Sequence, residues 1–69
     1  MRIDDLQALG ARLRQLRQHR RLEARDVAKA IGKHVTAIYN IERGAHGPAV
    51  TTLIALLDLY GAELEIRAH

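Results

Sequence analysis

Several side chains in the segment GKHVTAIYNIERG, residues 32 to 44, have groups that can bond the edges of nucleic-acid bases. An asparagine such as Asn40 can form two hydrogen bonds with an adenine edge, and an arginine such as Arg43 can bond a guanine or a phosphate. The methyl groups of Val35 and Thr36 can pack on thymine methyl groups. The segment therefore carries groups that suit contact with double-stranded DNA.

Other side chains nearby suit the sugar-phosphate backbone. Tyr39 can donate its hydroxyl to a phosphate oxygen, although it can instead pack as a half-buried aromatic on the first helix. Lys33 and the N-terminus of the helix that follows would hold another phosphate. His34 fits a helix cap or a phosphate contact better than a metal ligand, because the histidines do not fall at ligand spacings. The predicted DNA-binding set is Arg25, Lys33, His34, Val35, Thr36, Tyr39, Asn40 and Arg43.

The helical period divides this segment into two faces, at about 100° per residue. One side holds Thr36, Tyr39, Asn40 and Arg43, and the opposite side holds His34, Ile38, Ile41 and Glu42. We expect the first side to face DNA and the second to face the protein core.

The positive charge of the chain lies in its middle. Residues 10 to 45 hold nine Lys and Arg against three acids, a net charge of 9 − 3 = +6, whereas residues 1 to 9 sum to −1 and residues 46 to 69 to −2. Such a block is the electrostatic footprint of a phosphate-binding surface, although arginine-rich helix faces also occur as plain solvated surface. Four arginines are expected to act as solvated or steering charges rather than specific contacts: Arg12, Arg14, Arg20 and Arg21.

Length and composition exclude several kinds of protein. A chain of 69 residues forms one small domain that buries only about 60% of its unfolded surface, so association is expected to support it. There is no cysteine, and therefore no disulfide and no thiolate metal site. No nucleophile with a neighbouring base, paired carboxylates or phosphate-cradling loop is present, so we predict no catalytic site, no metal and no cofactor. Short apolar runs and an acidic N-terminus predict a soluble cytoplasmic protein that does not enter a membrane.

Apolar spacing predicts helices through most of the chain. The first, over residues 4 to 20, has Leu6, Leu9, Leu13 and Leu16 on one stripe, with Asp4 or Asp5 near its N-terminus. The second, over residues 23 to 31, buries Val27, Ala28 and Ile31 and ends at Gly32 in a left-handed cap. The third, over residues 35 to 43, ends at Gly44. The fourth follows Pro48 and is expected to turn inward Val50, Leu53, Ile54, Leu57 and Tyr60.

The segments LGARLRQLRQHRRL, DVAKAIG, IYNIERG and PAVTTLIALLDLYG resemble the Cro/CI-repressor type of helix-turn-helix domain, also called the XRE type. The resemblance covers about residues 9 to 61 without a gap, and its most specific positions are Arg17, Ala28, Gly32, Ile38, Glu42, Gly44 and Pro48. It implies an all-α fold, a compact lambda-repressor-like domain of four to five helices. It also implies a structural ion pair between Arg17 and Glu42.

The C-terminal segment GAELEIRAH has a different pattern. Ala62, Leu64 and Ile66 alternate with charged residues, which is typical of a strand. Such a strand would pair with its copy across a two-fold axis, in a dimer interface formed by Glu63, Leu64, Ile66 and Arg67. A frayed coil or a short final helix is the alternative. The arrangement resembles the HipB antitoxin subgroup, so we expect a DNA-binding domain over residues 1 to 61 and a dimerisation strand over residues 62 to 69.

These inferences predict a sequence-specific DNA-binding transcriptional regulator, a repressor that binds a palindromic operator as a homodimer. The alternative is an antitoxin that binds and neutralises a kinase-type toxin protein and regulates its own synthesis. An enzyme is the third and most remote hypothesis, because the sequence has no catalytic constellation.

Overall fold

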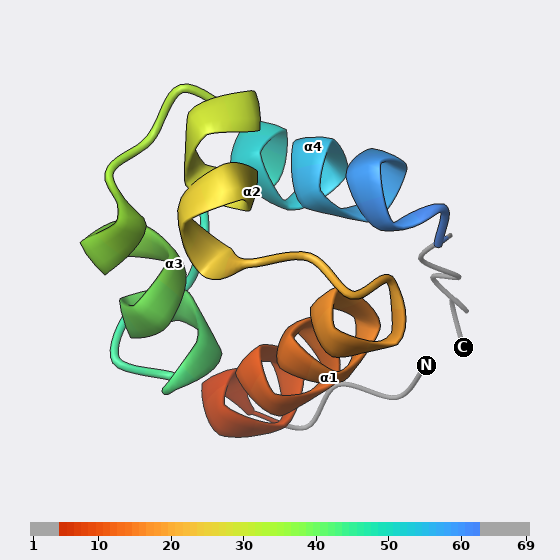
Figure 1. Ribbon diagram of the computed structural model, residues 1–69. Helices are drawn as coiled ribbons and strands as arrows, with labels where there is room; N and C mark the ends of the chain where they lie inside the picture. The colour runs from red at the N-terminus through yellow and green to blue at the C-terminus, as the bar shows by residue number, and fades with distance from the viewer. Residues whose placement is uncertain (1–4, 63–69) are drawn as a thin grey trace.

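The computed structural model describes residues 5–62, which form four helices (Figure 1). They are α1 (Leu6–His19), α2 (Ala24–Ala30), α3 (Val35–Glu42) and α4 (Val50–Tyr60). In Figure 1, α3 lies at the left edge, α1 along the bottom and α4 at the upper right. The prediction of an all-helical domain is confirmed for the described residues, with helix boundaries within a few residues of those expected.

The start of α1 follows from one acidic side chain. The Asp5 carboxylate accepts a hydrogen bond from the Ala8 backbone N–H at 2.7 Å, which satisfies one of the unpaired donors of the first turn. Leu9 and Leu13 are buried below this cap, whereas Leu6 remains 45% exposed. The buried stripe of α1 therefore begins one turn later than expected.

All four described helices end in the same way. The residue after each C-cap, or the C-cap itself in α4, has a left-handed φ: 56° at Arg21, 71° at Gly32, 75° at Gly44 and 66° at Gly61. The next backbone N–H then bonds a carbonyl in the last helical turn, as Lys33 N does to Ala28 O at 2.8 Å. The corresponding bonds at the other three ends are 2.9 to 3.1 Å long. Only at α1 does a residue other than glycine occupy the left-handed position.

The core lies where α2 crosses α3 and where α1 packs against α3 and α4. Ala28 and Val27 of α2 and Ile38 of α3 are at most 2% exposed. Gly10 permits the close approach of α1 to the end of α3, because a Cβ on Gly10 would lie 2.3 Å from the carbonyl oxygen of Ile41. The position of α3 on the domain is therefore fixed by backbone contact as well as by side-chain burial.

The inward face of α4 differs from the one expected. Val50 and Ile54 are 71% and 53% exposed, so their predicted burial is wrong, and Leu56 is buried together with Leu57 and Tyr60. Apolar residues occur on almost every side of this helix, and its own spacing therefore does not select the side that meets α1. That choice is made by contact with the rest of the domain.

The predicted strand lies outside the described residues, except for Ala62 at its start. The same applies to the expected dimer contacts of Glu63, Leu64, Ile66 and Arg67. Within residues 5–62, no helix has both the length and the apolar character needed to cross a membrane.

Candidate nucleic-acid interface

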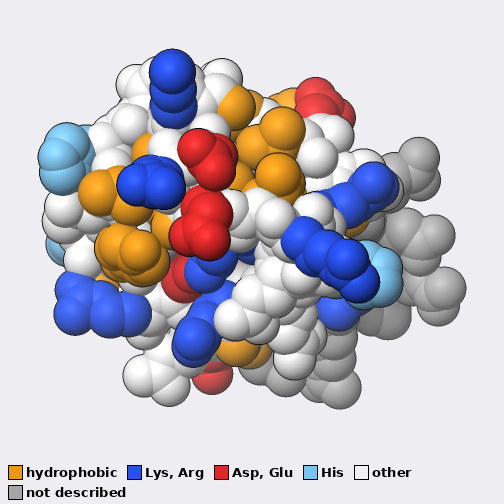
Figure 2. All heavy atoms as spheres, in the orientation of Figure 1, with side chains coloured by type: hydrophobic (Ala, Val, Ile, Leu, Met, Phe, Trp, Pro, Cys, Tyr) orange, Lys and Arg blue, Asp and Glu red, His pale blue; other side chains and the backbone are white. Residues whose placement is uncertain are grey.

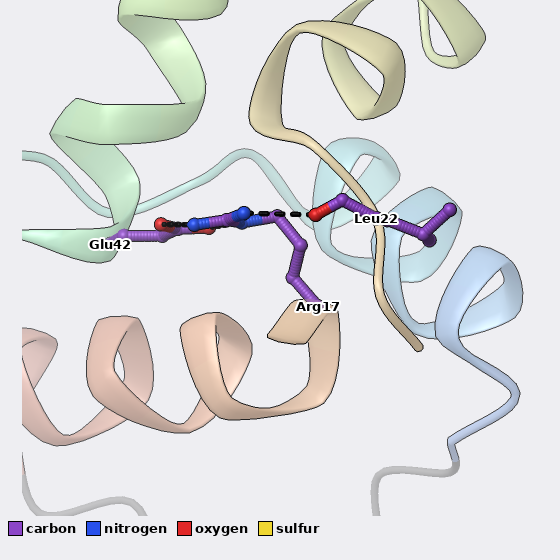
Figure 3. Close-up of polar contacts among 3 residues, drawn as sticks. All are labelled: Arg17, Leu22 and Glu42. Atoms are coloured by element: carbon purple, nitrogen blue, oxygen red, sulfur yellow. Dashed lines mark hydrogen bonds and ion pairs between the residues drawn. The ribbon is translucent and has the colours of Figure 1, made fainter. Parts of the chain in front are cut away.

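An ion pair fixes the end of α3 to α1. Arg17 Nε donates to Glu42 Oε2 at 2.7 Å, and Arg17 Nη2 donates to Glu42 Oε1 at 3.0 Å (Figure 3). The remaining edge of the guanidinium donates to the Leu22 carbonyl at 2.9 Å, in the turn before α2. The side chains of Arg17 and Glu42 are only 12% and 6% exposed, so the structure brings together the pair that the family resemblance implies. The hydrogen bond to Glu42 raises the pKa of Arg17, which stays charged.

The outward face of α3 has the polar composition expected from the helical period. Thr36 and Arg43 are exposed, Asn40 is partly exposed, and Tyr39 is 51% exposed. Ile38 and Ile41 on the opposite side are buried. One face of this helix is thus held in the core, while the other presents hydroxyl, amide and guanidinium groups to the outside.

His34 occupies the N-cap of α3. Its Nδ1 atom accepts from the Thr36 backbone N–H at 3.2 Å and lies 3.0 Å from Thr36 Oγ1. An accepting Nδ1 places the proton of a neutral ring on Nε2. His34 therefore satisfies one N–H of the first helical turn itself, and Nε2 is the ring nitrogen left to meet a phosphate. Val35, in contrast, is partly buried against the core, which reduces the methyl surface available for a base.

Asn40 and Arg43 form a contact that the sequence analysis missed. Arg43 Nη2 donates to Asn40 Oδ1 across one turn of the outward face. A separation of three residues on a helix is a known signal for such pairs, and it was available in the sequence. The two polar groups expected to read bases independently are therefore bonded to each other in the free protein.

Positive charge is spread widely over the molecule. Arg25 and Lys33 are exposed on α2 and in the turn before α3. Figure 2 shows Lys and Arg side chains on the left, in the centre and on the right of the face it presents, with acidic side chains near the middle. Because Arg17 neutralises Glu42, the carboxylate at the end of α3 adds little repulsion toward an anion near this helix.

Arg20 departs from its expected role as a solvated charge. Its Nε donates to the Tyr60 carbonyl at 2.9 Å, at the C-terminal end of α4. The guanidinium also lies against Gly61, where an added Cβ would collide with it. A cation at a helix C-terminus is favoured by the helix dipole, so Arg20 connects α1 to α4. Arg12, by comparison, bonds only the exposed Gln15 on its own helix among the described residues.

Comparison with known proteins identifies the family of this four-helix domain. The profile of the helix-turn-helix domain family matches residues 8–69. The chain belongs to this family. In a helix-turn-helix, the first helix crosses the DNA backbone and the second lies in the major groove, so α2 and α3 of this domain correspond to the crossing and recognition helices. The resemblance to Cro/CI-repressor type domains is thereby confirmed.

One curated relative of this helix-turn-helix domain is the HTH-type transcriptional regulator DdrOP3 of Deinococcus deserti. It is 42% identical over 50 residues, which make up 72% of this chain and 39% of the relative. The chain thus spans well under half the length of that relative.

Two solved structures share the fold of the helix-turn-helix domain. The clp gene regulator ClgR of C. glutamicum superposes with a TM-score of 0.77 at 28% identity, covering 83% of this chain and 74% of its own. A chain of the HipA-HipB-O2-O3 complex superposes with a TM-score of 0.81, covering 99% of this chain and 96% of its own. At 20% identity, the second likeness shows the fold alone.

Proposed function

We propose that this domain is a transcriptional repressor that reads a short palindromic operator in double-stranded DNA as a homodimer. The observation that carries the proposal is the outward face of α3. Thr36, Tyr39, Asn40 and Arg43 are accessible there, while the opposite face of the same helix is buried and its end is held by the Arg17–Glu42 pair. A recognition helix needs accessible polar groups on a rigid support, and α3 has both.

The side chains divide into two roles. Thr36 in the first turn of α3, Asn40 in its last turn and Arg43 at its C-cap reach the edges of bases, and the partly buried Val35 adds an apolar contact. Arg25, Lys33, His34 and Tyr39 bond phosphates and fix the register of the helix on the duplex. No cofactor or catalytic step enters this function.

A second copy of the chain binds the other half-site of the operator. Residues 62–69 pair in antiparallel fashion across a two-fold axis, so that Glu63 of one chain faces Arg67 of the other, and Leu64 and Ile66 cover apolar surface of α4. The exposed Val50 and Ile54 are apolar surface of this kind. The axis would set the two recognition helices about 34 Å apart, one turn of DNA.

A second function, that of an antitoxin, is proposed from the resemblance of the segment LLDLYGAELEIR to the HipB antitoxin subgroup. In this role the domain would bind a kinase-type toxin protein in addition to DNA. Affinity purification of the tagged chain from its native host, followed by mass spectrometry, tests it. A stoichiometric second protein supports the antitoxin role, and the chain alone contradicts it.

Selection of bound duplexes from a random library tests the repressor proposal. We expect enrichment of a sequence with two inverted half-sites, their centres about ten base pairs apart. Deleting residues 62–69 should abolish tight operator binding and convert the dimer to a monomer in sedimentation at micromolar concentration. Retention of duplexes with no common sequence would contradict the proposal, and a truncated chain that remains dimeric would contradict the interface.

A further inference from the structure

The contact between Asn40 and Arg43 determines which base this part of α3 can read. Arg43 Nη2 donates to Asn40 Oδ1, and both side chains lie on the accessible face of the helix. From this geometry we propose that the two residues act as one donor-only unit that selects guanine. The inference rests on the proposed function, because it names the base that the same site prefers.

The hydrogen-bond inventory of the pair supports this choice. An isolated asparagine offers an acceptor, Oδ1, and a donor, Nδ2, which together match the N6 and N7 atoms of adenine. Here Oδ1 is already used by Arg43, while Nδ2 and the other N–H groups of the guanidinium are left to donate. The pair therefore presents donors where a free asparagine would present one donor and one acceptor.

A carbonyl oxygen has a second lone pair, so Oδ1 has room for a further donor. The guanidinium beside it nevertheless carries a full positive charge, which repels the N6 amino group of adenine and the N4 amino group of cytosine. Guanine has two acceptors, N7 and O6, on its major-groove edge, and thymine has only O4. Guanine is thus the base whose edge the unit complements best.

Removal of Arg43 gives the sharpest test. In Arg43→Ala, Oδ1 of Asn40 becomes free, so the position that the unit reads should change from guanine in the wild-type selection to adenine in the variant. The matched control is Arg12→Ala, which removes the same charge from the exposed surface of α1. The control should leave the selected base unchanged, and circular dichroism should show that both variants retain their helices.

Base analogues show which DNA groove and which base atom the pair contacts, and they require no change to the protein. Replacing the selected guanine by 7-deazaguanine removes N7, and we expect a loss of affinity of about tenfold. Replacement by inosine keeps N7 and O6 and should have little effect.

The outcomes separate the inference from the function on which it rests. A wild-type preference for adenine at this position, or the same base chosen by the wild type and Arg43→Ala, would overturn the donor-only unit while leaving sequence-specific binding intact. Failure of the wild type to enrich any duplex would overturn the proposed function, and the inference with it.

Discussion

Arg17 and Glu42 form a two-point ion pair that joins α1 to the last residue of α3, with both side chains mostly shielded from water. Arg17 makes one bond more than Glu42, since it also holds the Leu22 carbonyl. The pair thereby connects three segments of the domain at the end of the recognition helix.

This relationship predicts an unequal response to substitution. Glu42→Gln should lower the free energy of unfolding by about 3 kcal/mol, because the Arg17 charge then remains in a largely buried site. Arg17→Met should lower the free energy of unfolding by a larger amount, since it leaves both the Glu42 carboxylate and the Leu22 carbonyl without their partner. Thermal or urea unfolding followed by circular dichroism measures both values.

The double variant Arg17→Met/Glu42→Leu is the control for this pair. It should be more stable than the sum of the two single changes implies, because no charge is left unpaired. Additive losses, or an unchanged stability in Glu42→Gln, would contradict the pairing.

The close approach of α1 to α3 predicts that Gly10→Ala is destabilising despite the higher helix propensity of alanine. A Cβ at this position would lie 2.3 Å from Ile41 O and 2.6 Å from Glu42 O, so the helices must separate. We expect a loss of about 2 kcal/mol, or roughly 10 °C in melting temperature for a domain of this size. Gly47→Ala is the control, because its Cβ would meet only the half-exposed Leu6 side chain at 3.1 Å. Equal melting temperatures for the two variants would show that the approach is not tight.

Arg21 has a left-handed φ of 56°, at the position that glycine occupies after the other three described helices. Arg21→Gly should therefore raise stability by about 0.5 to 1 kcal/mol, since glycine adopts this conformation without a steric penalty. Arg21→Ala keeps the penalty and should give no gain. If both variants had the same stability, the left-handed conformation of residue 21 would not be a source of instability.

Burial raises the pKa of Tyr60 to about 12, and the nearby Glu42 carboxylate adds to the shift. An unfolded tyrosine titrates near pH 10, so between about pH 10 and pH 12 the unfolded chain loses a proton that the folded chain retains. The contribution of Tyr60 to the free energy of unfolding is therefore fully present below pH 10. It should fall across this window by about 1 kcal/mol per pH unit. Unfolding measured from pH 9 to 12 should show this fall in the wild type and in Tyr39→Phe, which changes an exposed tyrosine. Persistence of the fall in Tyr60→Phe would assign it to another group.

Local signals in the sequence predicted the helices and their ends. The left-handed cap at Gly32 was predicted because such a cap depends on the chemistry of one residue. An acid near the start of the first helix was also expected, at Asp4 or Asp5, and the structure shows that Asp5 is the N-cap. Burial in α4 was predicted wrongly at Val50 and Ile54 because that helix is apolar on most sides. Gly10 and the bonds made by Arg20 were missed because they depend on which helices meet, and this is a property of the assembled fold.

In the candidate site, too, local sequence signals predicted some features, and others depend on the assembled structure. The outward direction of Thr36 and Arg43 followed from the helical period alone. The bond between Asn40 and Arg43 changes what those groups can read, and it depends on the rotamers that the two side chains adopt together. Spacing indicates that such a contact is within reach, but the structure is needed to show that it forms.

We propose that α3 reads bases through its outward face while neighbouring residues hold phosphates. The most direct measurement is the affinity of Asn40→Ala and Lys33→Ala for the selected operator and for a random duplex, by fluorescence anisotropy at several salt concentrations. Asn40→Ala should lower the preference for the operator by roughly 1 to 3 kcal/mol, whereas Lys33→Ala should weaken both duplexes alike and reduce the salt slope by about one. Equal losses on operator and random DNA for Asn40→Ala would contradict the claim.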